Sequence, residues 1–510
     1  MNMRYFIGLD NGGSVTKAGL FDEHGNELAV SSVLAKPITP RMNYVERDTN
    51  ELIAANFQCI KDVIAKSGVS PQDIKAVSVT GHGNGLYLVG FDGKPSYNGI
   101  ISTDTRAASY VHRWYSDGTI DKVLPKTKQM IWAGQLTPLL AWFKDNAKDI
   151  LDQSKYAFTV TDLVRFYLTG EAYGEITNMS SISAMNLETR DYDDEIFACF
   201  GISEYRRLFS PIRLSHDICG CVTQQASELT GLLCGTPVAG GIVDFSACPI
   251  ATGVTREDQL SIVAGTWSIN SYVSKKPVQA LDLFMSSLYP MNDFYLIMEG
   301  SMTSASNLEW FVQKIMKEEQ IEAAKSGQNI YKICDEMIAQ LPPEESPVIF
   351  LPFLFGTNVN DEAKSCFLGI NFMHDKVHLL RAVYEGVVFS TMMHVENLMK
   401  YRKKRPTVVR ISGGAANSKV WVQMFADALQ IPIEVANAKE LGAKGVAICA
   451  AIAVGVFPGY QEAIDGFVSV KSICQPDPLK RDIYANKYNL YKKLVNNLDG
   501  VWKEWKNIYK

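Results

Sequence analysis

The N-terminal stretch 5–21 restricts the fold more than any other segment of the chain. It contains two apolar runs rich in aromatic and branched residues, separated by Asp10 and the turn 11–13, which reads Asn-Gly-Gly. Such a turn permits the positive φ angles of a tight hairpin, so the stretch is predicted to form two antiparallel strands. A third strand-like run at 27–33 follows. The chain is therefore expected to open with three antiparallel strands before any helix.

The turn of this hairpin could bind a phosphate group. Backbone N–H groups in a glycine-rich turn form a concave anion site, to which a neighbouring hydroxyl and a lysine can add. Asp10, at the end of the first strand, could hold a hydrated Mg²⁺. The phosphate-binding candidates are Gly12, Gly13, Ser14, Thr16 and Lys17. An ordinary first hairpin of a sheet is an equal alternative at this stage.

The length of the chain predicts two domains. Its 510 residues exceed what one hydrophobic core usually holds. The pattern of strand, glycine turn and strand recurs around Gly265 and Thr266, so we expect a duplicated architecture divided near Thr255. The predicted domains are residues 1–255, which include the first phosphate hairpin, and residues 256–510, with a central cleft between them.

Composition favours small-molecule partners. The chain is 47% hydrophobic and 21% charged with a net charge of −5, so it has no basic surplus to bind nucleic acid. It has no apolar run of the length that a membrane span requires and no signal-peptide pattern, so we expect no membrane association and a cytoplasmic protein. The ten cysteines include no CxxC pair, which argues against a disulfide scaffold or a zinc ribbon.

A carboxylate ends a glycine-containing apolar strand in the first half of the chain. The strand is predicted at 238–243, and Asp244 follows it, before the small-residue run 246–253. A carboxylate at a strand end can meet a ligand and act as a general base. The same position is typical of a helix N-cap. Spacing alone leaves the two roles of Asp244 equally supported.

Two further segments carry polar candidates for a ligand site. His82 lies in the glycine-flanked loop 81–85 at a strand end, where ligand sites of open α/β sheets are often found, although a lone loop histidine can simply be solvated. Asp104 and Arg106 are two residues apart. They could share one face of an extended segment or pair with each other as a surface salt bridge.

The third glycine site lies near the C-terminal end. A short branched strand at 408–411 leads into a loop containing Gly413 and Gly414, and a helix capped near Asn417 follows. So much bare main chain could lie against the flat face of a nucleotide. The loop lacks the lysine of a P-loop and the third glycine of a dinucleotide fingerprint, so both of those motifs, and with them a dehydrogenase, are rejected.

The chain is expected to end in an amphipathic helix at about 480–510. Aromatic and branched residues recur there at spacings of four and three. This helix could pack back on the N-terminal domain or take part in a subunit contact, which leaves a homodimer possible.

With these sites in hand, the whole chain resembles the FGGY family of carbohydrate kinases. The run Ser365–Ile370, then His378-Leu379 and the run Ala382–Glu385 look like the second signature of that family at the correct separations. The run Thr137–Asn146 looks like the first signature, with Leu139 in place of the usual lysine. The resemblance implies an α/β, two-domain ribonuclease H-like (actin-like ATPase) fold with a central inter-domain cleft.

The resemblance also implies roles for the candidate residues. Asp10 and its turn would bind phosphate and Mg²⁺, Gly265-Thr266 would form the second phosphate loop, and Gly413, Gly414 and Asn417 would lie against the adenosine of ATP. Asp244 would be the general base that deprotonates the attacking sugar hydroxyl. The residues that fall where the family holds its sugar are His82, Asp104, Arg106 and Asp244.

Within the family, the L-xylulose kinase branch is the most similar that we can name. The motifs that carry this likeness are Leu9–Ser14, Gly265–Trp267, Asn307–Phe311, Leu351–Leu354 and Glu385–Ser390. They imply transfer of the γ-phosphoryl group of ATP to the terminal hydroxyl of a ketopentose such as L-xylulose. Ser102 and Thr103 replace the tryptophan that D-xylulose kinases usually carry. The alternatives are another sugar or polyol, namely D-xylulose, erythritol, glycerol or ketogulonate, or a catalytically silent actin-like nucleotide switch.

Overall fold

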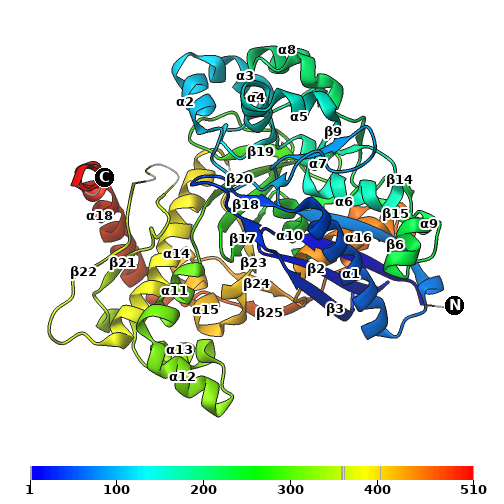
Figure 1. Cartoon of the computed structure of the whole chain (residues 1–510). Coiled ribbons are helices and arrows are strands. Elements are labelled where there is room, and N and C mark those ends of the chain that lie inside the picture. The colour runs from blue at the N-terminus through cyan, green and yellow to red at the C-terminus, as the bar shows by residue number, and fades with distance from the viewer. Residues whose placement is uncertain (1–2, 358–359, 361, 403, 509–510) are drawn as a thin grey trace. The chain divides into compact units, whose positions relative to one another are not determined.

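The computed structural model describes residues 3–357, 360, 362–402 and 404–508 (Figure 1). The chain divides into two compact units. The first contains the residues up to Thr255 together with Val273–Ile297 and Asn437–Ser469, and the second contains Arg256–Tyr272, Met298–Ala436 and the residues from Val470 onward. Neither unit is continuous in sequence, because two segments from beyond residue 255 belong to the first unit and interrupt the second.

The sheet of the first unit is built around the N-terminal hairpin. Strands β1 (Tyr5–Asn11), β2 (Val15–Asp22) and β3 (Glu27–Leu34) pair antiparallel in chain order, so the predicted meander is confirmed. Strand β6 (Ile74–Gly81) pairs parallel with β1. Beyond β6 the sheet continues through β15 (Pro237–Ala239) to β14 (Ile218–Cys221), and the short β16 (Ile242–Val243) also pairs with β6.

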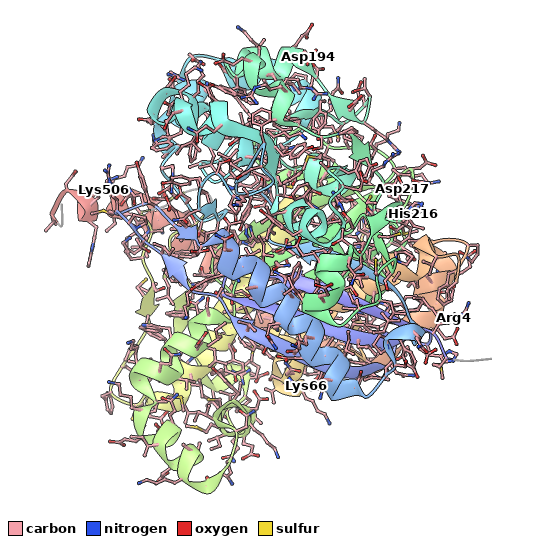
Figure 2. All side chains as sticks on the ribbon, turned by 45° about the vertical axis from the view of Figure 1, so that its right-hand side comes forward. Arg4, Lys66, Asp194, His216, Asp217 and Lys506 are labelled. Atoms are coloured by element: carbon pink, nitrogen blue, oxygen red, sulfur yellow. The ribbon has the colours of Figure 1, made fainter. Side chains whose placement is uncertain are left out.

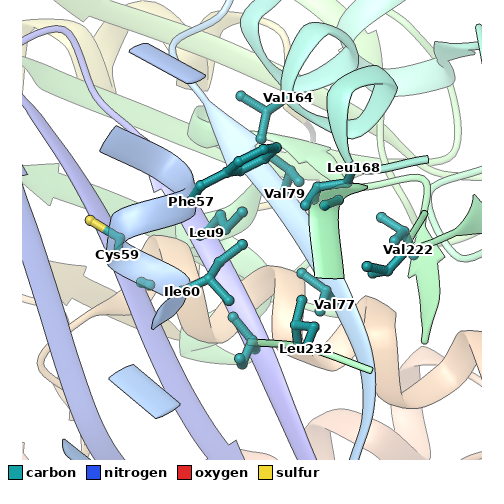
Figure 3. Packing of buried hydrophobic residues seen from close by; sticks show 14 of the residues in the cluster. Leu9, Phe57, Cys59, Ile60, Val77, Val79, Val164, Leu168, Val222 and Leu232 are labelled. Carbon is teal, nitrogen blue, oxygen red and sulfur yellow. The ribbon is translucent and has the colours of Figure 1, made fainter. Parts of the chain in front are cut away.

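Helices cover both faces of this sheet. Helix α1 (Thr49–Ser67) packs on β2 and β3, where Figure 1 shows it beside them, and α16 (Leu441–Ala453) packs on β1 and β6. On the α1 side, Leu9, Ile60 and Val79 are part of one buried apolar cluster, shown in Figure 3. On the α16 side, a Cβ at Gly8 would lie 1.9 Å from the carbonyl oxygen of Ala443, so only glycine permits this close approach.

The second unit repeats the strand arrangement of the first. Strands β17 (Gln259–Ala264) and β18 (Ser268–Ser274) form an antiparallel hairpin, and β23 (Val408–Ser412) pairs parallel with β17. β24 (Ile433–Ala436) and β25 (Val470–Cys474) follow β23 in the sheet, and β20 (Tyr295–Ser301) lies next to β18. The order of hairpin and parallel neighbour is that of β2, β1 and β6, which agrees with a duplicated architecture.

Four helices of the second unit carry residues that line a cavity described below. They are α11 (Ser306–Ile315), α13 (Ile330–Ala339), α14 (Lys376–Lys400) and α15 (Lys419–Leu429). The terminal helix α18 (Arg481–Ile508) contacts α15 and β21 (Ile349–Leu351). Its aromatic stripe, Tyr484, Tyr488, Tyr491 and Trp502, is buried. These contacts lie within the second unit.

No helix in the described part of the chain is long and apolar enough to cross a membrane.

Candidate active site

The first unit places Asp10 beside the start of α16. Asp10 lies opposite Lys17 in the β1–β2 register, and the N–H of Gly12 donates to the carbonyl oxygen of Val15 at 3.0 Å to close the turn. A Cβ at Gly442 would lie 2.2 Å from Oδ2 of Asp10. Because Gly442 has no Cβ, it leaves the space that the Asp10 carboxylate occupies.

Lys17 is held by an ion pair within the same unit. Its Nζ lies 2.8 Å from Oε2 of Glu440, the residue before α16, and both side chains are partly exposed. Thr16, the neighbouring candidate, points to the opposite face of β2 because successive residues of a strand alternate. Its buried hydroxyl accepts a hydrogen bond from Arg47 at 2.9 Å and lies 3.4 Å from Oδ1 of Asn11. The structure therefore keeps Lys17 with Asp10 and separates Thr16 from them.

Asp10 and Asp244 are both partly exposed and lie close enough together for their charges to interact, and we call the pair the carboxylate centre. Burial raises the pKa of Asp10 to about 6, an effect that Lys17 opposes and Glu440 adds to. Burial also raises the pKa of Asp244 to about 7, with a further contribution from the charge of Asp10. Two neighbouring carboxylates with raised pKa values are short of compensating positive charge. Oxygen donors of this kind fit Mg²⁺, which is commonly held by one or two carboxylates together with substrate phosphates.

Asp244 begins helix α10 (Asp244–Thr252), and the N-cap residue is Val243. The carboxylate accepts a hydrogen bond from the N–H of the next residue, Phe245, at 2.7 Å, and within the described part of the chain no N–H from further into the helix donates to it. The N-cap alternative for Asp244 is therefore wrong. Its side chain is not committed to the helix end, and it remains able to interact with a ligand.

A buried glutamate supports the strand that carries Asp244. The N–H of Val243 donates to Oγ1 of Thr177 at 3.0 Å, and the Thr177 hydroxyl donates to Glu175 at 2.6 Å. Glu175 also accepts from the Ser215 hydroxyl at 2.6 Å. Sequence reasoning missed this support, because Glu175 and Thr177 lie far along the chain from the strand that they hold.

The loop 81–85 lies against Asp244 through its backbone and also carries His82 and Asn84. His82 is buried, its Nε2 lies 2.8 Å from the hydroxyl of Tyr87, and burial lowers its pKa to about 4, so the ring is neutral at pH 7. The backbone amide of Gly83 lowers the pKa of Asp244, which places the loop against the carboxylate. Asn84, which sequence reasoning overlooked, has a φ of 67° and a buried Oδ1 without a hydrogen-bond partner in the described chain. The only feature of Asn84 that is visible in the sequence is its position between Gly83 and Gly85.

Asp104 and Arg106 form a buried network with Glu46. The guanidinium Nη2 lies 2.9 Å from Asp104 and 2.7 Å from Glu46, and all three side chains are almost fully buried. Asp104 also accepts from the backbone N–H of Val45 at 2.7 Å. A surface salt bridge, the simple alternative from the sequence, is therefore wrong.

Arg106 keeps one free donor in this network. Its guanidinium stacks over the rings of Tyr44, at 4.2 Å, and Trp142, at 5.1 Å. Its Nη1 is buried and has no hydrogen-bond partner within the described residues. An unsatisfied buried donor is costly, so a ligand oxygen at this position would be stabilised. Within this pair, the unpartnered polar atom is Nη1 of Arg106, whereas both carboxylate oxygens of Asp104 accept hydrogen bonds from the described residues.

The second unit contains a cavity of about 770 Å³ at its glycine sites. The residues predicted to bind nucleotide that line it are Gly265, Thr266, Gly414 and Asn417. Gly413 does not line the cavity. It has a φ of 85°, and a Cβ there would lie 2.6 Å from the backbone of Ala264, so this glycine brings the loop against β17.

A carboxylate that the sequence did not reveal also lines this cavity. Oδ1 of Asp335 accepts hydrogen bonds from the Ser418 hydroxyl at 2.7 Å and the Tyr384 hydroxyl at 3.0 Å, and burial raises the pKa of Asp335. Tyr331 and Lys332 from the same helix, α13, line the cavity beside it. Because α13 lies far from the glycine loop in sequence, no local motif connects the two.

Two sheets with a repeated hairpin, a pair of neighbouring carboxylates and a glycine-lined cavity define the chain as a two-unit α/β protein with two candidate ligand sites. Models of the N-terminal and C-terminal domains of the FGGY family of carbohydrate kinases match residues 5–250 and 260–454. The chain belongs to this family, and it is an ATP-dependent carbohydrate kinase.

Named relatives agree with this assignment. The chain is 34% identical to the L-xylulose/3-keto-L-gulonate kinase of Escherichia coli (strain K12), over 98% of each chain. It is also 34% identical to a probable L-xylulose kinase of Pasteurella multocida (strain Pm70), over 98% of this chain and 100% of the relative. Among solved structures, xylulose kinase from Lactobacillus acidophilus shares the fold with a TM-score of 0.89, at 21% identity over 98% of this chain and all of that one.

Proposed function

We propose that this kinase transfers the γ-phosphoryl group of ATP to the terminal hydroxyl of a ketopentose of the L-xylulose type. The observation that carries the proposal is the Asp244 carboxylate, which lies beside Asp10 and has its pKa raised to about 7. A general base works best when its pKa is close to the working pH. The names of the relatives that are 34% identical over nearly the whole chain support the choice of sugar.

In this proposal the first unit binds the sugar and carries the proton chemistry. Asp244 takes the proton of the attacking hydroxyl, while Asn84 and Nη1 of Arg106 offer an acceptor and a donor to the other hydroxyl groups. Asp10 would hold Mg²⁺, and a metal ion there would supply positive charge to the phosphoryl oxygens. The turn residues Gly12, Gly13 and Ser14 would donate N–H groups to the phosphate. His82 would form part of the wall of the sugar site with its neutral ring, which lies beside Tyr87.

The second unit would bind the nucleotide. We assign Gly265 and Thr266 to the phosphates and Gly413, Gly414 and Asn417 to the adenosine. Asp335 would be a further nucleotide residue, because its Oδ1 is used by Ser418 and Tyr384 while the carboxylate still lines the cavity. A carboxylate in this position can accept hydrogen bonds from the two ribose hydroxyl groups.

One observation favours a second candidate substrate, a sugar acid such as a ketogulonate. Arg47 is buried, and its side chain donates to Thr16 without a carboxylate within ion-pair distance among the described residues. Its charge lowers the pKa of His82, so the two lie close together. A buried guanidinium with a single neutral partner would be stabilised by the carboxylate of a substrate. The relative from Escherichia coli is named for both kinds of sugar.

A sugar panel tests these proposals. Sugar-dependent ADP release would be measured with D- and L-xylulose, D- and L-ribulose, erythritol, glycerol and 3-keto-L-gulonate. We expect the highest kcat/KM with L-xylulose. The sugar acid would replace it if its kcat/KM were higher and fell at least about tenfold in Arg47→Gln, with the L-ketopentose rate less affected. ATP binding without ADP release for any sugar would favour the silent nucleotide switch and contradict the proposal.

A further inference from the structure

A second cavity of the first unit lies outside the carboxylate centre and has a volume of about 660 Å³. It is formed by the hairpin of β11 (Met185–Asn186) and β12 (Asp191–Tyr192), the 3-10 turn Ser203–Leu208 and strand β13 (Ile212–Arg213). None of the residues assigned above to sugar, metal or nucleotide lines it. Three arginines do, namely Arg190, Arg206 and Arg213.

Aromatic rings hold two of these guanidinium groups in place. Arg213 stacks over Tyr173 with 4.7 Å between the guanidinium carbon and the ring centre, and Arg206 stacks over Tyr192 at 4.4 Å. Stacking uses the flat face of a guanidinium and leaves its N–H groups available at the edge. Both arginines are thus oriented without spending their hydrogen-bond donors on a carboxylate.

The ion pairs of the arginines are weak. Arg206 lies 3.6 Å from Asp194, and Arg190 lies 3.8 Å from Asp293, both longer than a hydrogen bond. The two carboxylates are 89% and 85% exposed, so water screens the attraction. An anion in the cavity would therefore replace Asp194 and Asp293 as the partner of these arginines at little cost in free energy.

The lining also includes two carboxylates, which reduce its positive charge, and the charge of Asp217 acts directly on Arg213. Three arginines and two aspartates, Asp191 and Asp217, leave a net lining charge of +1. Asp217 accepts a hydrogen bond from the N–H of Leu214 at 2.9 Å, and Asp191 accepts from the N–H of Tyr192 at 2.7 Å. Figure 2 shows Asp217 with His216 at one edge of this unit.

A buried hydroxyl group in the lining lacks a partner. Ser210 is 6% exposed, and its Oγ has no hydrogen-bond partner in the described part of the chain. Leaving a buried hydroxyl unsatisfied costs about 1–3 kcal/mol. An oxygen atom of a ligand in the cavity would satisfy it.

We propose that this cavity binds the phosphate monoester of a small sugar, the chemical class of the kinase's own product. Arginine is suited to this ligand because its fork of donors matches two phosphate oxygens at once. The hydroxyl groups of a sugar would meet Ser210 and the polar rim. The choice of a sugar ester rests on the kinase activity, whereas the anion site rests on the cavity alone.

The test measures binding and requires no turnover. Ribose 5-phosphate and inorganic phosphate would be titrated by calorimetry into the full-length protein, its Arg213→Gln and Arg206→Gln variants, and the control Arg113→Gln. Arg113 stacks over Tyr110 at 4.9 Å, as Arg213 does over Tyr173, but does not line the cavity. Any binding of the ester at the active site is common to all four proteins. Unchanged melting temperatures would show that the variants are folded, and Arg213 is exposed, so we expect none to unfold.

We expect wild type and Arg113→Gln to bind one more equivalent of ribose 5-phosphate than Arg213→Gln, in which the affinity of that equivalent falls at least tenfold. Arg206→Gln should behave like Arg213→Gln, and Ser210→Ala should weaken the same equivalent two- to fivefold. Equal binding by Arg213→Gln and Arg113→Gln would overturn the site. Inorganic phosphate binding as tightly as the ester would overturn the assignment to a sugar phosphate.

Discussion

The hairpins β1–β2 and β17–β18 share one arrangement of strands and differ in their charge. In the first unit, the strand end and its neighbours carry Asp10, Lys17 and Glu440, and α16 leaves room for the Asp10 carboxylate through Gly442. In the second, the turn carries only Gly265, Thr266 and Trp267 between two uncharged strands, and it borders a cavity of about 770 Å³. Under the proposed function, this difference assigns the charged chemistry to the first turn and the nucleotide to the second.

Among the substitutions that test this comparison, Gly442→Ala is expected to have the largest effect, a fall in kcat. The new Cβ would lie 2.2 Å from Oδ2 of Asp10, so the carboxylate must move from its place beside Asp244. Because a displacement of about 1 Å can cost about 100-fold in rate, we expect kcat to fall about 100-fold. The affinity for ATP, measured by fluorescence or calorimetry, should stay within about threefold if the second unit binds the nucleotide.

Gly500→Ala is the matched control for that substitution. Gly500 also lies in a helix, and a Cβ there meets no atom within 4 Å. We expect unchanged kcat and a slightly higher melting temperature, since alanine favours a helix over glycine. A Gly442→Ala enzyme as active as the control would show that Asp10 is not held in the way described.

The second substitution, Gly413→Ala, tests the uncharged hairpin. A Cβ would lie 2.6 Å from the backbone of Ala264, and the φ of 85° disfavours alanine. We expect the glycine loop to move away from β17, KM for ATP to rise about tenfold, and the free energy of unfolding to fall by about 2 kcal/mol.

Its control is Gly327→Ala, since Gly327 has a φ of 69° and open space around its Cβ position. Gly327→Ala introduces a similar backbone strain without a close contact such as the one that Gly413→Ala makes with Ala264. Equal effects of the two substitutions on KM for ATP would contradict the role given to the loop.

A smaller effect is expected from Asp335→Asn. The amide keeps the shape of the side chain and removes its charge, so KM for ATP should rise about three- to tenfold with kcat within about twofold. Glu336→Gln, at the exposed neighbouring position, should leave both parameters unchanged. If 2′-deoxy-ATP were discriminated equally by wild type and Asp335→Asn, the assignment of Asp335 to the ribose would be wrong.

The pH dependence of stability gives the smallest expected effect. The folded pKa values of Asp10 and Asp244, about 6 and 7, lie above the ordinary value of 3.8. Stability from these groups is present below about pH 4 and is lost as the pH rises through 6 to 7, because the buried charges must then form. In the absence of ligands, Asp244→Asn should raise the melting temperature by a few degrees at pH 8 and leave it nearly unchanged at pH 5. A melting temperature at pH 8 equal to that of wild type would contradict the raised pKa of Asp244.

The sequence predicted the parts of the site that are local and missed those that depend on distant segments. The meander, the two hairpins and the Asp244 strand end follow from period-two patterns and glycine turns, each of which is visible within a single short stretch of sequence. Glu175, Asp335 and Asn84 were missed. The first two join the site through elements far away in sequence, and the burial of Asn84 is a property of the folded loop.

Thr16 and the pair Asp104–Arg106 show a second limit of sequence reasoning. Thr16 lies next to Lys17, but strand alternation turns it to the face covered by α1, where it meets Arg47. The aspartate and arginine were expected either to share a face or to form a surface pair, and they are buried with Glu46 because a much earlier segment of the chain covers them. Spacing identified the residues, but it could not give their burial.

The most direct test of the account is the rate of Asp244→Asn with saturating ATP and L-xylulose. The isosteric amide cannot take the proton of the sugar hydroxyl, so we expect sugar-dependent ADP release to fall by about 10²- to 10⁴-fold, with the affinity for ATP unchanged. In wild type, kcat/KM should rise with pH through about 7, as the base loses its proton. An Asp244→Asn enzyme that phosphorylates the sugar within tenfold of the wild-type rate would contradict the assignment of Asp244 as the general base.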